Sequence, residues 1–384
     1  MKLLIITQVV DKNYAPLCFA VEWFREFGKQ CEKVTVIGQK VGEYDLPSNV
    51  NVLSLKKEEE KSKFLQVMRF YSLAWKHRND YEAVFVHMTP IWVVFGTPLW
   101  LLLRKRMYLW YEARGTGWNL RWGLRFVRKA FSASPGGMPL PTKKSVITGH
   151  GVDTAFFTPP GFSSSEAPAG AESRSIGAEP LLDSIGEAAA SLRSLEESRD
   201  PNLIVTVGRI TKAKRLDIIV QCFAELPSNY RLQITGVPIT EEDHKTNAAL
   251  EALVQTLGME DRVSFGTIPD EELRLLLQKA TLFLHASEAT SLDKAPLQAM
   301  ASGCLVVTAS PVVKPHVPEI CRADPKTMAE AAKKILTLSF SDQEKLRKEL
   351  RTIVEQKHSL STLIRRLVAE MSYQTAIKTR GIAA

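Results

Sequence analysis

The chain has 384 residues, of which 45% are hydrophobic and 24% charged, and its formal net charge is +8. This is the composition of a globular protein, so it excludes general disorder, and the length predicts two domains. The five cysteines lie far apart without a C-x-x-C pair, which argues against a disulfide scaffold or a zinc site and indicates a reducing compartment. We therefore expect a cytoplasmic protein.

The first half of the chain reads as strands alternating with helices. Apolar runs predict strands at Lys2–Ile6, Lys33–Ile37, Ala83–His87, Tyr108–Tyr111, Ala130–Ser134 and Ser145–Thr148. The apolar start is too short for a signal peptide. The uncharged run Met88–Leu103 contains two prolines and a glycine and is too short to span a bilayer, so it predicts a buried helix. Short apolar strands between amphipathic helices are typical of a parallel sheet covered on both faces.

Residues 161–200 interrupt this alternation. They contain nine serines, seven alanines and four glycines, with eight acidic residues against three basic ones. Such a segment buries little apolar surface, so we predict a flexible linker over 159–200 after a first domain at 1–158.

The alternation resumes in the second half. The pattern predicts strands at Leu203–Val207, Arg231–Thr235, Val263–Phe265, Leu282–His285 and Leu305–Thr308. Helices are predicted at Leu216–Leu226, Ala248–Leu257, Glu271–Ala280, Ala295–Ser302 and Lys326–Leu336. We therefore expect an α/β protein with a second doubly wound, Rossmann-like domain at 201–340 and charged helices at 341–384. Two such domains would place a ligand in a cleft at the carboxyl ends of their strands.

The clearest local motif follows the first strand of the second domain. It reads Val207-Gly208-Arg209-Ile210-Thr211-Lys212-Ala213-Lys214-Arg215-Leu216. Gly208 permits a close backbone approach, and Arg209 and Lys214 bring two cations next to a helix N-terminus, a combination that suits a diphosphate. A solvated basic turn is the alternative.

A second strand-to-helix loop lies further along the chain. It reads Ser287-Glu288-Ala289-Thr290-Ser291-Leu292-Asp293-Lys294 and leads into a small-residue helix closed by Gly303. Its backbone N–H groups would face the same cleft as Arg209 and Lys214. Asp293 and Lys294 would alternatively only cap and solvate that helix.

Together these motifs resemble glycosyltransferase family 4, whose members are retaining enzymes with the two-domain GT-B fold. The resemblance rests on Gly208-Arg209 with Lys214, the turn Phe265-Gly266-Thr267 and the run Leu297-Gln298-Ala299-Met300-Ala301-Ser302-Gly303. The phrase Gly149-His150-Gly151-Val152-Asp153 also matches the segment that joins the family's two domains. The family's fold further implies that the C-terminal helices pack back on the first domain.

The resemblance implies a role for each matching residue. Arg209 and Lys214 would neutralise the diphosphate of a nucleotide-sugar donor, and the backbone at Phe265, Gly266 and Thr267 would hold the base. The loop Ser291–Lys294, which includes Leu292 and Asp293, would meet the sugar and phosphates, and Gln298 would bind the ribose. Asp293, Asp11 and Glu112 are candidates for orienting sugar or acceptor hydroxyls. The donor is a substrate, so the resemblance implies neither a cofactor nor a metal.

The sequence also departs from the family. Thr290 and Gln298 stand where the family has two glutamates, and Glu288 lies two residues away from the first position. The family's front-domain histidine is absent from Trp110-Tyr111-Glu112-Ala113, and His87 is expected to be structural. Two alternatives to a transferase therefore stay open: a non-catalytic subunit that binds a nucleotide sugar or glycan, and a nucleotide-sugar epimerase of the same architecture.

The first domain carries a concentrated positive charge. Residues 101–150 contain ten Lys or Arg and one acid, Glu112. On a helix predicted over Asn119–Phe131, Arg121, Arg125 and Arg128 form a stripe beside Trp118 and Trp122. This pattern is typical of an interfacial helix and would suit a glycan or lipid-linked acceptor at an anionic inner-membrane surface. The alternative is an ordinary surface helix whose arginines are solvated. Nucleic acid is not expected as a partner, because the sequence contains no recognisable nucleic-acid-binding module.

Overall fold

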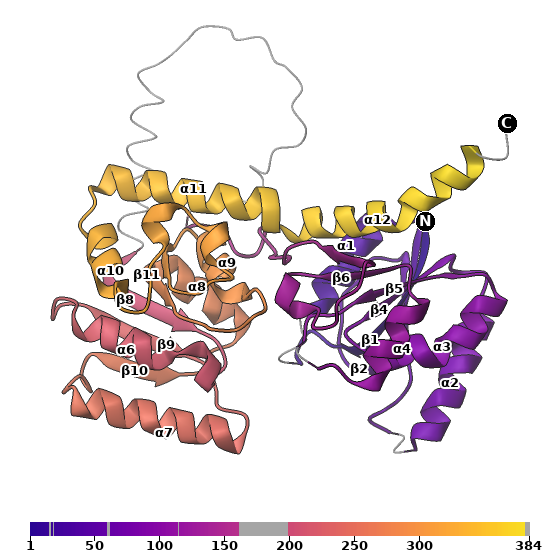
Figure 1. Cartoon of the computed structure of the whole chain (residues 1–384), viewed down its shortest axis with the longest axis horizontal. Helices are drawn as coiled ribbons and strands as arrows, with labels where there is room; N and C mark the ends of the chain where they lie inside the picture. The colour runs from indigo at the N-terminus through magenta and orange to yellow at the C-terminus, as the bar shows by residue number, and fades with distance from the viewer. Residues whose placement is uncertain (15–16, 18, 60–61, 114, 161–198, 381–384) are drawn as a thin grey trace, which may run out of the picture. The chain divides into compact units, whose positions relative to one another are not determined.

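The computed structural model describes residues 1–14, 17, 19–59, 62–113, 115–160 and 199–380 (Figure 1). The predicted linker lies outside these residues from 161 to 198. The chain divides into two compact units, and each is described by itself. The first contains Met1–Gly151, Thr290–Leu292 and Lys357–Ala384, and the second contains Val152–Ala289 and Asp293–Gln356.

The first unit is built on a seven-stranded parallel sheet in the order β3-β2-β1-β4-β5-β6-β7. Its strands are β1 (Lys2–Val10), β2 (Lys33–Val41), β3 (Val50–Ser54), β4 (Ala83–His87), β5 (Arg106–Trp110), β6 (Lys129–Ser132) and β7 (Ser145–Ile147). Its helices are α1 (Ala20–Gln30), α2 (Lys63–Lys76), α3 (Pro90–Leu102), α4 (Trp118–Phe126), the 3-10 turn η1 (Pro135–Gly137) and α12 (Leu360–Arg380).

Alternate side chains of these strands point to opposite faces of the sheet and pack into two apolar layers. One layer joins alternate residues such as Val84 and Leu109 to side chains of α2, α3 and α4. On the other face Phe85 packs against Phe27 of α1, and α1 packs against α12. The hydroxyl of Tyr108 donates to the backbone oxygen of Met371 at 3.0 Å and ties α12 to this face. Both faces are thus covered, which explains why β4 is buried at every residue.

The second unit contains a five-stranded parallel sheet in the order β10-β9-β8-β11-β12. Its strands are β8 (Asp200–Val207), β9 (Arg231–Thr235), β10 (Val263–Gly266), β11 (Ala280–His285) and β12 (Leu305–Thr308). Its helices are α6 (Leu216–Ala224), α7 (Glu241–Thr256), α8 (Asp270–Lys279), α9 (Lys294–Ala301), α10 (Met328–Leu336) and α11 (Phe340–His358). Short 3-10 turns are η3 (Lys212–Lys214), η4 (Lys314–His316) and η5 (Glu319–Cys321).

Helix α11 is fastened to the second unit by one arginine. The guanidinium of Arg351 donates to the backbone oxygens of Thr154, Phe157 and Ala301. These bonds join α11 to the start of the unit and to the end of α9. The single side chain thus donates to three backbone carbonyls at once.

The predicted pair of doubly wound parallel sheets is confirmed, whereas one predicted helix is too long and one strand was not predicted. The helix predicted over Asn119–Phe131 ends at Phe126, because Val127 takes an extended conformation and the chain enters β6. Arg128 therefore does not share a helix with Arg121 and Arg125. The short strand β3 was not expected, and it pairs with β2 at the edge of the first sheet.

Candidate functional site

The candidate site lies at the carboxyl ends of β8, β11 and β12 in the second unit. Gly208 follows β8 with a φ of +146°, a conformation that L side chains rarely adopt. A Cβ atom on Gly236, after β9, would overlap the backbone oxygen of Gly208. The two glycines thus let neighbouring strand ends approach closely, as expected at the ligand-binding edge of a parallel sheet.

Lys214 is held at this edge by Asp293. Its Nζ atom lies 2.6 Å from Oδ1 of Asp293, and the two side chains are 21% and 15% exposed. The end of the lysine side chain also runs beside Gly208, where an added Cβ would lie 3.5 Å from Cε. The motif predicted Lys214 at the site but gave no sign of this carboxylate partner.

Asp293 has a second partner in the buried His285 at the end of β11. Nε2 of His285 lies 2.9 Å from Oδ2 of Asp293, and Nδ1 lies 3.1 Å from the hydroxyl of Thr308 at the end of β12. Burial lowers the pKa of His285, against the opposing effect of Asp293. Burial alone would raise the pKa of Asp293, but the His285 hydrogen bond and the Lys214 charge hold it well below its usual range. These shifts favour an ionised Asp293 and a neutral His285 at neutral pH.

Arg209 forms a separate ion pair with Asp243. Its guanidinium donates twice to Oδ2 of Asp243, at 2.7 and 3.0 Å. Asp243 belongs to the capping box of α7 with Thr240, and backbone N–H donation from Thr240 is the first cause that keeps the pKa of Asp243 well below its usual range. Arg209 itself is about half exposed, so its outer face stays open to a ligand.

Arg215 completes the row of cations that follows β8. It pairs with Asp217 at 3.0 Å and with Glu288, whose own backbone N–H donates to Ala213 at 2.9 Å. Hydrogen bonding and charge from Asp217 raise the pKa of Arg215. The carboxylate of Glu288 is thus paired with Arg215 in this structure.

The remaining predicted donor residues lie around this edge. Phe265 and Gly266 are the last residues of β10, and Thr267 follows them. They therefore also lie at the carboxyl ends of the strands, but β9 separates β10 from β8 in the sheet. Gln298 is half-buried on α9, and Lys294 is the first residue of that helix. Ser291 and Leu292 group with the first unit, where the Leu292 N–H donates to the Ser134 hydroxyl at 3.2 Å. That N–H is consequently already bonded in this structure.

Glu112 is a partly buried acid of the first unit that accepts three hydrogen bonds. Its carboxylate accepts from the Ser132 hydroxyl at 2.7 Å, the Ala133 N–H at 2.6 Å and the Ser134 hydroxyl at 3.0 Å. Burial raises the pKa of Glu112, and these hydrogen bonds oppose that rise. His87 is also buried, with Nδ1 3.2 Å from the Thr7 hydroxyl and its ring against Trp23.

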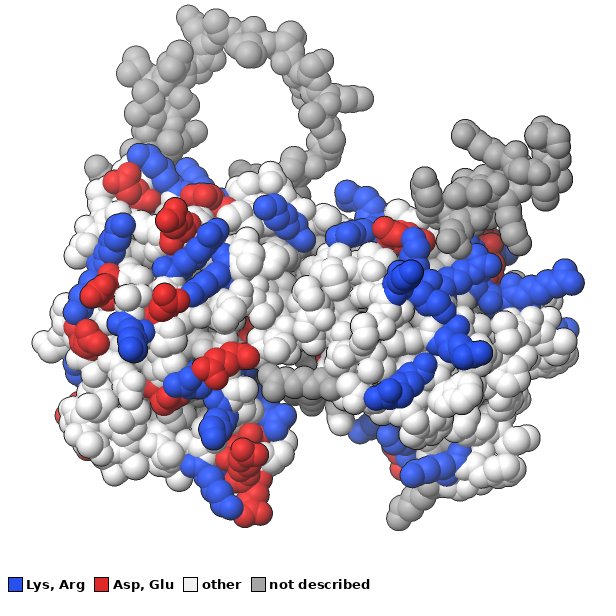
Figure 2. Space-filling model, viewed as in Figure 1, with Lys and Arg blue, Asp and Glu red and all other residues white. Residues whose placement is uncertain are grey.

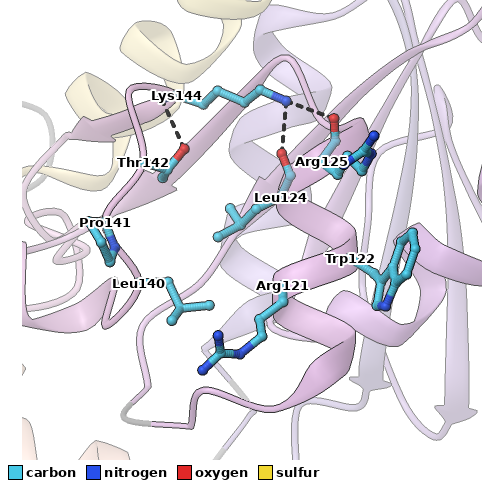
Figure 3. A pocket seen from close by; sticks show the side chains of 8 residues that line it. All are labelled: Arg121, Trp122, Leu124, Arg125, Leu140, Pro141, Thr142 and Lys144. Carbon is cyan, nitrogen blue, oxygen red and sulfur yellow. Dashed lines mark hydrogen bonds between the residues drawn. The ribbon is translucent and has the colours of Figure 1, made fainter.

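The predicted basic face forms an open groove of about 600 Å³ in the first unit. Figure 3 shows Arg121 on α4 extending toward Leu140, while Lys144 reaches the backbone oxygens of Leu124 and Arg125, each at 2.8 Å. Lys144 thus satisfies carbonyls at the end of α4. Arg125 also lines the groove, whereas Arg128 does not.

Comparison with known proteins finds a family match in the second half of the chain. Residues 189–357 match the model of the glycosyl transferases group 1 family. Mannosylfructose-phosphate synthase of Agrobacterium fabrum is 28% identical over 107 residues, which span 26% of this chain and only 24% of that protein.

Solved structures share the fold over nearly the whole chain. HepE of Anabaena in complex with UDP has a TM-score of 0.67 at 16% identity, covering 97% of this chain and 100% of that one. Sucrose-phosphate synthase from Thermosynechococcus elongatus has a TM-score of 0.67 at 15% identity, covering 98% and 100%. The resemblance seen in the motifs is thereby confirmed for the second half of the chain, where residues 189–357 match the glycosyl transferases group 1 family, and the GT-B fold is shared over nearly the whole chain.

Proposed function

We propose that the second unit binds a nucleotide-sugar donor and that the enzyme transfers its sugar, with retention, to a glycan or lipid-linked acceptor. The observation that carries this proposal is the placement of Lys214 beside the left-handed Gly208 at the carboxyl end of β8, with Arg209 in the same loop. Two cations at this position suit the two phosphates of the donor. In support, the fold is shared with HepE, which was solved with UDP and with UDP-glucose.

The proposed chemistry needs charge stabilisation at the leaving group. The bond between the anomeric carbon and the diphosphate oxygen breaks, and the acceptor hydroxyl bonds to that carbon on the same face. The hydroxyl proton passes to the departing diphosphate, so the reaction needs no enzymic nucleophile. Lys214 and Arg209 would stabilise the negative charge that develops on the diphosphate, an effect that is strongest where the donors are already oriented.

We propose that the first unit presents the acceptor side at the cytoplasmic surface of an anionic membrane. Arg121 and Arg125 have no acidic partner among the described residues, and the groove beside them combines charge with apolar lining. Figure 2 shows Lys and Arg over this part of the molecule with few acids near them. Such a face suits a phosphate-bearing acceptor or lipid headgroups.

Exposed apolar side chains on the neighbouring helices support the membrane proposal. Helices α2, α3 and α4 cover the same face of the first sheet. They expose the large apolar side chains of Phe64, Leu65, Met68, Trp75, Leu101, Leu102, Trp118 and Trp122. Exposed aromatic and aliphatic side chains close to arginines are typical of peripheral membrane binding. No helix in the described ranges has the length and apolarity needed to cross a bilayer.

The proposed reaction is tested with a panel of UDP and GDP sugars. Release of the sugar, or its transfer to a supplied acceptor, together with tight binding of the matching nucleoside diphosphate, is the expected result. Interconversion of two nucleotide sugars without an acceptor would instead identify an epimerase. Binding that is never followed by turnover, with any acceptor, would identify a non-catalytic subunit, and failure to bind any member would refute the donor site.

A further inference from the structure

Behind Lys214 lies a row of hydrogen-bonded polar groups that starts at the backbone of Ser310. The Ser310 N–H donates to the Thr308 hydroxyl oxygen at 3.1 Å, and that hydroxyl lies 3.1 Å from Nδ1 of His285. Nε2 of His285 then meets Asp293, which meets Lys214. Thr308 and Ser310 are buried, so this row is closed off from solvent except at the lysine end.

Only one placement of protons satisfies every bond in this row while His285 stays neutral. An ionised carboxylate can only accept, so Nε2 of His285 carries the proton and donates to Asp293. Nδ1 then holds a lone pair and accepts from the Thr308 hydroxyl. The Thr308 oxygen is in turn free to accept from the Ser310 N–H. Asp293 therefore fixes the tautomer of His285, and the Thr308 hydroxyl donates to the ring nitrogen that this tautomer leaves as an acceptor.

Asp293 makes these contacts in place of the hydrogen bond that would cap a helix. It is the N-cap residue of α9, a position where aspartate commonly accepts a hydrogen bond from the first turn. Here it makes no side-chain capping bond, and its two oxygens go to Lys214 and His285 instead. The orientation of the carboxylate is therefore explained by the lysine and the histidine.

We infer that His285 and Thr308 are positioning residues, which hold Asp293 so that Asp293 aims the Lys214 ammonium. The inference rests on the proposed function, because the aim matters only if Lys214 meets a diphosphate. One N–H of the ammonium is used by Asp293, which leaves two for a ligand. Fixing the first N–H restricts the directions of the others. A lysine held in this way stabilises a leaving group without reorganising during the reaction.

Substitutions of His285 or Thr308 should affect turnover more than donor binding. Losing the aim of Lys214 removes stabilisation that is needed mainly as charge develops, so kcat falls while KM for the donor changes little. Neither His285 nor Thr308 would touch the substrate, so their effects would pass through Asp293 and Lys214.

The experiment uses the full-length protein and whichever UDP or GDP sugar the unmodified enzyme turns over. Thr308→Val keeps the size of the side chain but removes the hydroxyl, and Thr308→Ser keeps the hydroxyl. We expect Thr308→Val and His285→Leu to lower kcat about 10- to 100-fold with KM nearly unchanged. Thr308→Ser keeps the hydroxyl and His285→Gln keeps an N–H donor toward Asp293, so both should recover most of that loss.

A second measurement is independent of activity. Nitrogen NMR of histidine-labelled protein reports which ring nitrogen of His285 is protonated, and His285→Gln assigns its signals. Protonation at Nε2 alone at neutral pH is expected, and the Nδ1–H tautomer or a charged ring would overturn the inference. Wild-type kinetics in Thr308→Val would overturn it as well. If Lys214→Ala leaves donor turnover unchanged, the proposed function fails first, whatever the tautomer of His285.

Discussion

The Nζ atom of Lys214 lies 2.6 Å from Oδ1 of Asp293, and this pair neutralises the cation that the sequence motif marks for a diphosphate. Arg209 is likewise paired with Asp243 at 2.7 Å. The site is consequently not a pool of unpaired positive charge. Its cations are oriented by carboxylates, and their affinity for an anion is lowered by the same partners.

Replacing Asp293 with Asn should therefore tighten the binding of a nucleoside diphosphate while slowing turnover. The variant gains one positive charge at the site, and the amide no longer fixes Lys214. We expect a gain of a few-fold in affinity for UDP or GDP, measured by calorimetry, since one unit charge near a partly exposed site contributes on the order of 1 kcal/mol. A marked loss of affinity would show that Asp293 itself contacts the nucleoside diphosphate.

Two glycines in the first unit offer a matched test of its packing. A Cβ on Gly96 of α3 would overlap the ring of Trp100, which is fully buried, so Gly96→Ala should destabilise the protein by about 1–3 kcal/mol. On Gly123 of α4 the nearest atom to a Cβ would be 3.5 Å away. Gly123→Ala should thus be neutral or stabilise by up to about 1 kcal/mol, through better helix propensity. Denaturant unfolding of both variants measures the difference, and equal effects would contradict this packing.

The partly buried Glu112 should make stability depend on pH in the acidic range. Its pKa is raised above the ordinary value of 4.5 in the folded state, so the folded protein binds this proton more tightly than the unfolded chain. This difference stabilises the folded protein at any pH below the pKa that Glu112 has in the unfolded chain. The stabilisation is lost as the pH rises through the pKa of Glu112 in the folded protein. Glu112→Gln, whose amide can accept from Ala133 and donate to Ser134, should remove that dependence.

Glu112→Ala provides the contrasting variant. It leaves the Ala133 N–H without its acceptor and should cost about 1–3 kcal/mol. Thermal unfolding of the wild type and both variants between acidic and neutral pH gives the comparison. An unchanged pH dependence in Glu112→Gln would show that Glu112 is not the titrating group.

The basic groove should contribute to binding of anionic vesicles. Arg121→Ser with Arg125→Ser removes two charges from the face of α4, and about 1 kcal/mol per charge predicts a roughly 10- to 30-fold weaker association. Sedimentation with vesicles containing phosphatidylserine measures it. The matched control is Lys12→Ser with Lys29→Ser, two exposed lysines of the same unit that have acidic partners. If both double variants lost vesicle binding equally, the net charge of the protein and not the groove would explain the binding.

Arg128 provides a further check on the geometry. The sequence pattern placed it on the same stripe as Arg121 and Arg125, but α4 ends at Phe126 and Arg128 lies in the link to β6. Arg128→Ser should therefore weaken vesicle binding less than either of the other two single substitutions. If Arg128→Ser weakened vesicle binding as much as Arg121→Ser, Arg128 would have to contact the membrane as well.

The sequence predicted the strand ends of the site well, because short apolar runs bounded by turn residues are a strong local signal. Gly208 and Lys214 belong to one such strand-to-helix turn. The end of α4 was missed because Leu120, Leu124, Val127 and Phe131 keep helical spacing, although Phe131 is buried in a strand. Apolar spacing alone does not tell where a helix passes into a strand.

The partners of the site's cations could not be predicted in this way. Asp293 lies 79 residues from Lys214 along the chain, and only the order of β8, β11 and β12 brings them together. His285 was predicted as the last residue of a strand, and nothing in its neighbours marks it as polar and functional. A histidine that ends a buried strand at the ligand edge of a parallel sheet is the signal that could have found it.

The central claim is that the loop after β8 binds the diphosphate of a nucleotide, and calorimetric titration of UDP and GDP tests it most directly. The wild type should bind one of the two, and Lys214→Ala should weaken that binding about tenfold or more, which corresponds to at least about 1.4 kcal/mol. Lys333→Ala, which removes an exposed lysine from α10 of the same unit, should bind like the wild type. Absence of binding to either nucleotide, or equal affinity in Lys214→Ala and the wild type, would contradict the account.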